Sequence, residues 1–140
     1  MNDFFSLTMS LYRPYVKKKI EPILNEHSLN LTRWLVLKDI GYHQPTALVE
    51  IAKRRFIEKS TTHQILKVFE EKQWIVVTTD KNDKCHKWIE LSKEGQVLFE
   101  SINQRILEMD DNILAEVKHD ENFEQMRDFM AQLLNRMKGS

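Results

Sequence analysis

The chain has 140 residues, of which 41% are hydrophobic, so it is long enough to form one domain with a substantial core. Its 21 basic and 21 acidic residues give no net charge, which on its own argues weakly against nucleic-acid binding. The presence of only three Gly and three Pro argues against a turn-rich all-β fold.

Targeting signals and disulfides are not expected. The first residues lack the basic stretch and the long apolar run of a signal peptide, and no segment reaches the roughly 18 apolar residues of a membrane span. The single Cys85 cannot form an internal disulfide. These observations favour a reducing, cytoplasmic location.

The basic residues lie ahead of an acidic C-terminal third. Net charge is +2 over residues 1–45, +2 over residues 46–90 and −4 over residues 91–140. The densest basic cluster consists of Lys53, Arg54, Arg55, Lys59 and Lys67. This asymmetry indicates that one face binds phosphates while another face has a different role.

Apolar residues at helical spacing predict two helices at the start of the chain. The first, over about 4–26, should kink or split at its prolines. The second, over about 31–40, should be buried because it is apolar on all sides. Asn30 or Thr32 can cap its start, and Gly41 is the expected C-cap.

Two further helices are expected over about 46–55 and 60–73. The buried residues of the first of these should be Leu48, Val49, Ile51 and Ala52. At about 100° per residue, the other helix has two distinct faces. Its core face consists of Thr62, Ile65, Leu66 and Phe69. Its opposite face, which has no carboxylate, consists of Ser60, His63, Gln64 and Lys67.

The hydrophobic period then changes to two. Strands are predicted over 74–79 and 86–91, joined by a polar turn. This hairpin would be marginal alone, so it must pack on the helices. Two longer helices follow: one over about 93–117, capped by Ser92, and one over about 121–137, with apolar residues at alternating spacings of three and four.

The pair of helices over 46–73 has a helix-turn-helix pattern, whose second helix enters the major groove of DNA. Base or phosphate contacts are expected from Ser60, Thr61, His63, Gln64 and Lys67. Backbone contacts are expected from Lys53, Arg54, Arg55 and Lys59. The alternative is the solvated face of an ordinary surface helix, but the hairpin that follows directly favours DNA binding.

The hairpin is interpreted as a wing. Its tip would place Lys81, Lys84 and Lys87 along an adjacent minor groove, where the negative potential attracts cations. The alternative is an edge hairpin kept soluble by lysines, and both interpretations can hold together.

The motifs, taken in order, resemble the MarR family of transcriptional regulators. The match falls in four parts of the chain. These are Leu31-Thr32 and residues 34–37; Thr46 and residues 50–52; residues 59–66 and 69–72; and Asp80, Asp83, residues 89–92 and Gly95. The resemblance implies a mainly α fold with a small β-hairpin wing. It assigns a winged helix-turn-helix region to 30–92 and a helical dimerisation region to 1–29 and 93–140, within a single domain.

The chain also departs from the family pattern. The usual wing Arg, two residues after the second Asp, is Cys85, and the Gly that usually closes the recognition helix is Gln73. The strand residue that is often Arg falls in Val77-Thr78. Lys81 and Lys84 can replace the wing Arg as point charges but lack its planar fork. The resemblance therefore supports the fold more strongly than it supports tight DNA binding.

The family resemblance also implies a homodimer that binds a pseudo-palindromic operator, by analogy as a repressor. A small aromatic effector would bind between the two regions. Candidate pocket residues are Tyr12, Tyr15, His27, Arg33, Trp34 and Tyr42. A self-contained bundle within one chain is the alternative to dimerisation. The alternative function is a ligand- or protein-interaction module that binds DNA weakly or not at all.

Other chemistry has little support in the sequence. Cys85, whose neighbours are Lys84, His86 and Lys87, is either a redox sensor or an incidental exposed thiol. Asp83, with its neighbours Cys85 and His86, matches no standard zinc spacing. No serine-hydrolase, P-loop, zinc-protease or dinucleotide-binding motif is present, so we expect no enzymatic activity and no cofactor.

Overall fold

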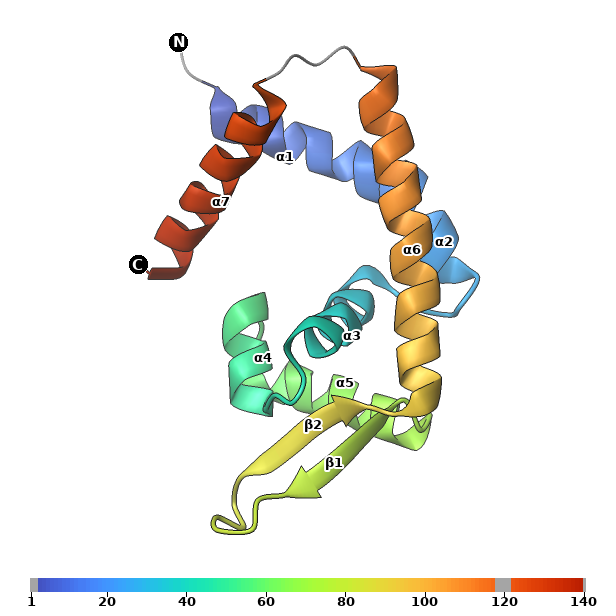
Figure 1. Ribbon diagram of the computed structural model, residues 1–140, viewed down its shortest axis with the longest axis vertical. Coiled ribbons are helices and arrows are strands. Elements are labelled where there is room, and N and C mark those ends of the chain that lie inside the picture. Colours follow the sequence, from blue (N-terminus) through green and yellow to red (C-terminus); the bar gives the residue numbers. More distant parts are fainter. Residues whose placement is uncertain (1–2, 118–121, 140) are drawn as a thin grey trace. The chain divides into compact units, whose positions relative to one another are not determined.

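The structure is a computed structural model that describes residues 3–117 and 122–139. Its elements, shown in Figure 1, are α1 (Phe4–Tyr15), the π-helix η1 (Val16–Ile20), α2 (Glu21–Asn25), α3 (Leu31–His43), α4 (Leu48–Arg55), α5 (Lys59–Glu71), β1 (Ile75–Thr79), β2 (Lys87–Leu91), α6 (Lys93–Glu116) and α7 (Phe123–Gly139). The chain divides into two compact units, Met1–Ile106 and Leu107–Ser140. The mainly α fold with a two-stranded hairpin confirms the predicted fold class.

The core of the first unit is built around α3. The helix begins at Asn30, whose side chain accepts a hydrogen bond of 2.8 Å from the backbone N–H of Arg33. Trp34, Val36 and Leu37 are at most 2% exposed, so the predicted burial of this helix is confirmed. The other elements of the unit contribute further fully buried side chains, namely Leu24, Ile51, Phe69 and Ile102.

Gly41 does not end α3, and the prediction of a C-cap there was wrong. The helix continues to His43. A Cβ on Gly41 would lie 2.7–2.8 Å from ring atoms of Phe99, so the glycine allows that ring to pack against the helix. The Phe99 ring also stacks on Trp34 and meets the edge of Tyr42.

The N-terminal helical segment is split, as predicted, but the split takes the form of a π-helical turn. Pro14 lies inside α1, whereas Pro22 lies in the first turn of α2, with η1 between them. Proline has no N–H to donate, so a helix that contains two prolines must rearrange its hydrogen bonds locally.

Helix α4, which was predicted to begin at about residue 46, starts later, at Leu48. Thr46 forms an isolated β-bridge with Ile89 of β2, through hydrogen bonds of 3.0 Å and 2.7 Å. Val49, which the sequence analysis placed inside, is 50% exposed. The pairing of Thr46 with β2 keeps this residue out of the helix, whereas Ile51 and Ala52 of α4 are buried as predicted.

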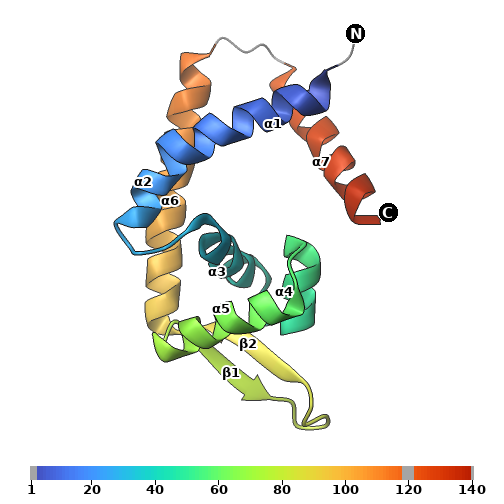
Figure 2. The same cartoon turned by 180° about the vertical axis from the view of Figure 1, so that it is seen from behind.

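The hairpin follows α5 after a left-handed residue. Gln73, which stands where the family pattern has a glycine, has a φ of 61°. This position therefore has the positive φ that favours glycine, although the residue is different. The strands pair antiparallel in a register that aligns Val77 with Ile89. Figure 1 and Figure 2 show the hairpin extending past α3, α4 and α5, with its connecting loop free of the helices.

Ser92 caps α6, as predicted. Its hydroxyl accepts a hydrogen bond from the N–H of Gly95 and donates one of 2.6 Å to the carbonyl of Gln73.

No helix among the described residues combines the length and the apolar character needed to cross a bilayer.

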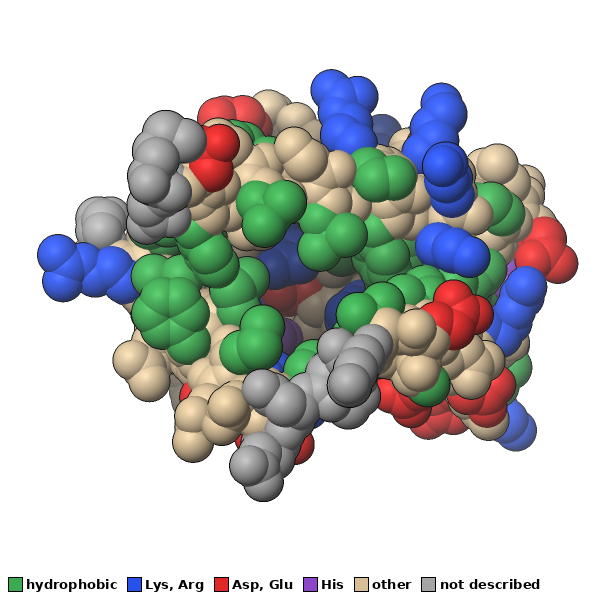
Figure 3. Space-filling model, turned by 90° about the horizontal axis from the view of Figure 1, so that it is seen from above, with side chains coloured by type: hydrophobic (Ala, Val, Ile, Leu, Met, Phe, Trp, Pro, Cys, Tyr) green, Lys and Arg blue, Asp and Glu red, His purple; other side chains and the backbone are tan. Residues whose placement is uncertain are grey.

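Both terminal helices carry uncovered apolar side chains. On α1 the exposed residues are Phe5, Leu7, Met9, Leu11 and Tyr12. On α7 they are Met126, Phe129, Met130, Leu134 and Met137. Hydrophobic side chains are visible at the molecular surface in Figure 3. Neither helix has a buried residue within the described chain, and exposed apolar faces of this kind are typical of interaction surfaces.

Candidate nucleic-acid interface

Helix α5 has the two faces that its sequence predicts. The four core-face residues, 62, 65, 66 and 69, are at most 7% exposed. The residues of the opposite face are exposed, namely Ser60, His63, Gln64 and Lys67, and Thr61 beside them is exposed as well. The orientation of the helix is thus confirmed, whereas contacts between these side chains and DNA stay a prediction.

The basic residues around the helix-turn-helix are not equivalent. Lys53 and Lys59 are exposed, and Arg55 is half-buried. Arg54 instead donates from Nε and Nη2 to the buried carboxylate of Asp39, at 2.7–3.2 Å, and from Nη2 to the hydroxyl of Thr46 at 2.7 Å. The guanidinium of Arg54 is thus held by internal acceptors, and its contact with phosphate stays a prediction.

The hairpin tip is organised by Asp80. One carboxylate oxygen accepts hydrogen bonds from the backbone N–H groups of Asn82 and Asp83, and the other accepts one of 2.9 Å from the indole of Trp88. The Trp88 hydrogen bond, followed by the backbone bond from Asn82, lowers the pKa of Asp80. The Trp88–Asp80 bond thus links the end of β1 to β2 at the base of the loop.

Lys81, Lys84 and Lys87 are exposed on and beside this loop. Cys85 is also exposed, and its backbone N–H donates to the Asp83 carboxylate. An aspartate that starts a polar turn signals an Asx-turn, so the backbone contacts of Asp80 were open to prediction. The hydrogen bond from Trp88 to Asp80 could not be predicted from the sequence, because it depends on the register of the two strands.

We predict that Asp80→Asn loosens the tip at neutral pH and that acid does the same in the wild type. The pKa of Asp80 is lowered on folding, so its stabilising contribution is present above the ordinary value of 3.8 and is lost as pH falls through the lowered value. The measurement is the Trp88 indole resonance in proton–nitrogen spectra, assigned with Trp88→Phe.

The control for this prediction is Asp83→Asn, because that carboxylate accepts the N–H of Cys85, whereas the indole of Trp88 donates to Asp80. We expect the Trp88 resonance to move in Asp80→Asn and to stay in place in Asp83→Asn. An unmoved resonance in Asp80→Asn would show that the tip does not depend on this bond.

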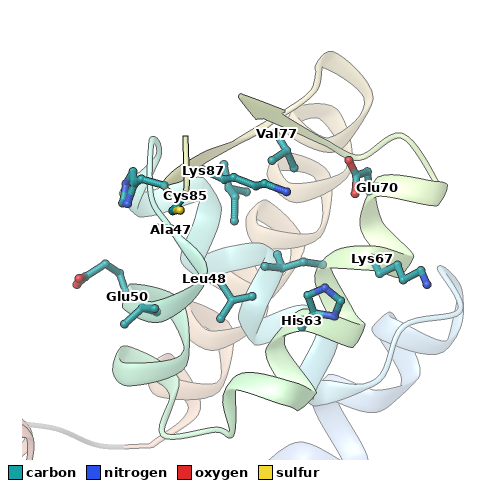
Figure 4. A pocket seen from close by; sticks show the side chains of 13 residues that line it. Ala47, Leu48, Glu50, His63, Lys67, Glu70, Val77, Cys85 and Lys87 are labelled. Carbon is teal, nitrogen blue, oxygen red and sulfur yellow. The ribbon is translucent and has the colours of Figure 1, made fainter. Parts of the chain in front are cut away.

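A groove of about 720 Å³ lies between α5, the start of α4 and the hairpin. Its apolar lining consists of Ala47, Leu48, Val49, Leu66, Val77 and Ile89. Its polar lining consists of Glu50, His63, Lys67, Glu70, Cys85, His86 and Lys87. Figure 4 shows Lys87 from the hairpin and His63 from α5 approaching the groove from opposite sides. The sequence analysis missed this groove, because it arises only when three separate segments pack together.

The predicted effector residues are dispersed over the first unit. Trp34 is 2% exposed and packs on Phe99, and the hydroxyl of the exposed Tyr42 accepts a hydrogen bond from Asn103. Tyr12 is exposed on α1. Tyr15, His27 and Arg33 are partly exposed. Trp34 and Tyr42 thus lie close together because both contact the ring of Phe99. The binding of an effector by the six candidate residues stays a prediction.

The described residues contain no group of three or more His, Cys, Asp or Glu side chains arranged to hold a metal ion. Oxidation of Cys85 stays a prediction, with the thiol at the exposed tip of the hairpin.

Comparisons with known proteins agree with this geometry. Residues 29–86 match the model of the MarR family. An uncharacterised HTH-type transcriptional regulator of Staphylococcus aureus is 38% identical over 113 residues, which cover 81% of this chain and 77% of the relative.

Solved structures extend the likeness to almost the whole chain. A Staphylococcus aureus MarR in complex with salicylate and kanamycin is 32% identical, with a TM-score of 0.84 over 96% of this chain and 89% of that chain. A MepR–DNA complex from S. aureus shares the fold, with 23% identity and a TM-score of 0.76 over 94% of this chain and 97% of that chain. This chain therefore belongs to the MarR family of transcriptional regulators.

Proposed function

We propose that the protein is a homodimeric regulator that binds a pseudo-palindromic DNA operator and acts as a repressor. The observation that carries the proposal is the outer face of α5, which is exposed and has no carboxylate from Lys59 to Lys67. In this proposal α5 enters the major groove, where Gln64 can bridge an adenine edge. Lys53, Arg55 and Lys59 hold the adjacent phosphates.

The groove between α5 and the hairpin supports the same arrangement. A helix in the major groove and a hairpin in the minor groove must straddle the sugar–phosphate strand between them. The groove lies between α5, the start of α4 and the hairpin, and His63, Lys67 and Lys87 line it together with Glu50 and Glu70. Lys81 and Lys84 at the tip then lie where the negative potential of the minor groove is strongest.

Dimerisation is proposed from the uncovered apolar faces of α1 and α7. A second copy is the simplest partner for faces of this kind, because a two-fold axis pairs each patch with itself. Two recognition helices would then reach half-sites roughly one DNA turn apart. The MepR–DNA complex supports the DNA part of the proposal, at the level of the shared fold.

We further propose that a small aromatic molecule relieves repression. Salicylate is bound in the related MarR structure, and 4-hydroxyphenylacetate in the NadR structure. Trp34 and Tyr42, which flank Phe99, are the central members of the candidate pocket, with Tyr12, Tyr15, His27 and Arg33 around them. The proposal predicts that such an aromatic acid weakens DNA binding.

Titration of the protein against genomic fragments at low salt tests DNA binding directly. Retention of one fragment at raised salt, followed by operator selection, would support the proposal. Failure to bind any fragment would favour the alternative, an interaction module on the same fold. Cys85 in the place of the usual wing Arg gives that alternative its specific support.

For Gln64→Ala we predict relaxed specificity at one base-pair position, with a loss of about 1–3 kcal/mol on the selected operator. Binding to scrambled DNA should hardly change. The matched control is Gln104→Ala, which makes the same change at an exposed position of α6. Equal losses on selected and scrambled DNA would mean that Gln64 does not read a base.

A further inference from the structure

We infer that Asp39, Arg54 and Thr46 form a buried anchor that positions α4 and the hairpin relative to each other, so that Arg54 supports DNA binding without touching DNA. The inference deepens the proposed function and rests on it for its consequence in DNA binding. The contacts that carry it lie wholly within the first unit, and they join α3, the segment before α4, and α4 itself.

The geometry of the anchor is that of a fork on a carboxylate. Arg54 Nε lies 3.2 Å and 3.0 Å from the two oxygens of Asp39, and Nη2 lies 2.7 Å from Oδ1. Nη2 also donates to the hydroxyl of Thr46 at 2.7 Å. A lysine could not reproduce this arrangement, because its single ammonium lacks the planar fork.

Burial fixes the guanidinium in place. The Asp39 side chain is only 3% exposed, and that of Arg54 is 23% exposed. If Arg54 turned outward to a phosphate, it would leave a buried carboxylate without its hydrogen-bonded cation. The next nearest guanidinium, that of Arg55, has its Nε 3.8 Å from Asp39 and makes no hydrogen bond from that atom within the described structure.

The anchor reaches the hairpin through Thr46. While its side chain accepts from Arg54, its backbone pairs in both directions with Ile89 of β2. Close by, the side chain of Gln44 accepts a hydrogen bond of 2.8 Å from the N–H of Leu91. The segment before α4 is therefore bound on one side to the helix-turn-helix and on the other side to the hairpin.

The test compares Arg54→Lys with Lys53→Gln, using a labelled mixed-sequence duplex titrated at several salt concentrations. Arg54→Lys keeps the charge and loses the fork, so we expect binding about tenfold weaker with an unchanged salt slope. Lys53→Gln removes a charge from the adjacent, exposed position, so we expect the slope to become shallower by about 0.9 per lost phosphate contact.

Thr46→Val removes the hydroxyl to which Arg54 donates and leaves the ion pair between Arg54 and Asp39 in place, and a urea unfolding curve of this variant separates positioning from stability. We expect faster hydrogen–deuterium exchange at the Ile89 N–H and weaker DNA binding, again with an unchanged slope. If Arg54→Lys bound DNA as tightly as the wild type, or if neither variant changed exchange at Ile89, the anchor would be refuted.

The two hypotheses can fail separately. If the wild type bound no duplex at low salt, the proposed function would be refuted, whereas exchange at Ile89 in Thr46→Val and Arg54→Lys would still decide whether the anchor holds the hairpin. Normal DNA binding by the wild type with unchanged exchange in both variants would refute the anchor alone.

Discussion

Gly95→Ala is expected to destabilise the protein by about 3 kcal/mol, at the upper end of the usual cost of overpacking. A Cβ at this position would overlap the carbonyl oxygen of Trp74 and lie 2.8 Å from its carbonyl carbon. Backbone atoms cannot move aside as a flexible side chain can. The same carbonyl also accepts the N–H of Ser92, so a shift would disturb the junction between the hairpin and α6.

Chemical unfolding in urea measures this effect, and Gly139→Ala provides the matched control. A Cβ at Gly139 would meet no atom within 4 Å, so this variant should equal the wild type or gain slightly from the higher helix propensity of Ala. Gly95→Ala should also weaken DNA binding, because α6 begins where the hairpin ends. Equal unfolding midpoints for the two variants would contradict the prediction.

Met130→Asp combined with Leu134→Asp is expected to convert the proposed dimer into monomers and to weaken operator binding by about 10²–10⁴-fold. Both side chains are exposed on α7 in a single chain, and an interface would bury the new carboxylates without partners. A monomer binds one half-site and loses the gain from linked binding, which is of this size.

Light scattering and an operator titration measure the two parts of that prediction. The control is Gln132→Asp, which adds one such charge to the same helix at a position about 200° around from Met130. We expect this control to stay dimeric. A wild type that is monomeric at micromolar concentration, or a dimeric double variant, would contradict the proposed role of α7.

The sequence was sufficient where the fold depends on periodicity. The two faces of α5 follow from the helical repeat, and the side chains at 62, 65, 66 and 69 are buried as predicted. The strands were predicted to within about one residue, because alternating β-branched residues are bounded by polar turns. Ser92 was identified as a cap from its residue type and position.

The sequence was insufficient where a residue's role depends on a distant partner. Thr46 has the residue type of a helix cap, but its backbone pairs with a strand 43 positions later. Arg54 lies in a run of cations that look alike in sequence, and only the buried Asp39 distinguishes it. The groove between α5 and the hairpin likewise requires three segments to meet.

The bridge between Thr46 and Ile89 has a consequence for how the hairpin can adapt. It places β2 between two hydrogen-bonded neighbours near its middle, whereas the outer half of the hairpin has only its own two strands. Bending is therefore confined to the part beyond the Val77–Ile89 pair. Minor grooves differ in width with base composition, so this outer half can follow the local shape of DNA while the inner half keeps the spacing from α5 constant.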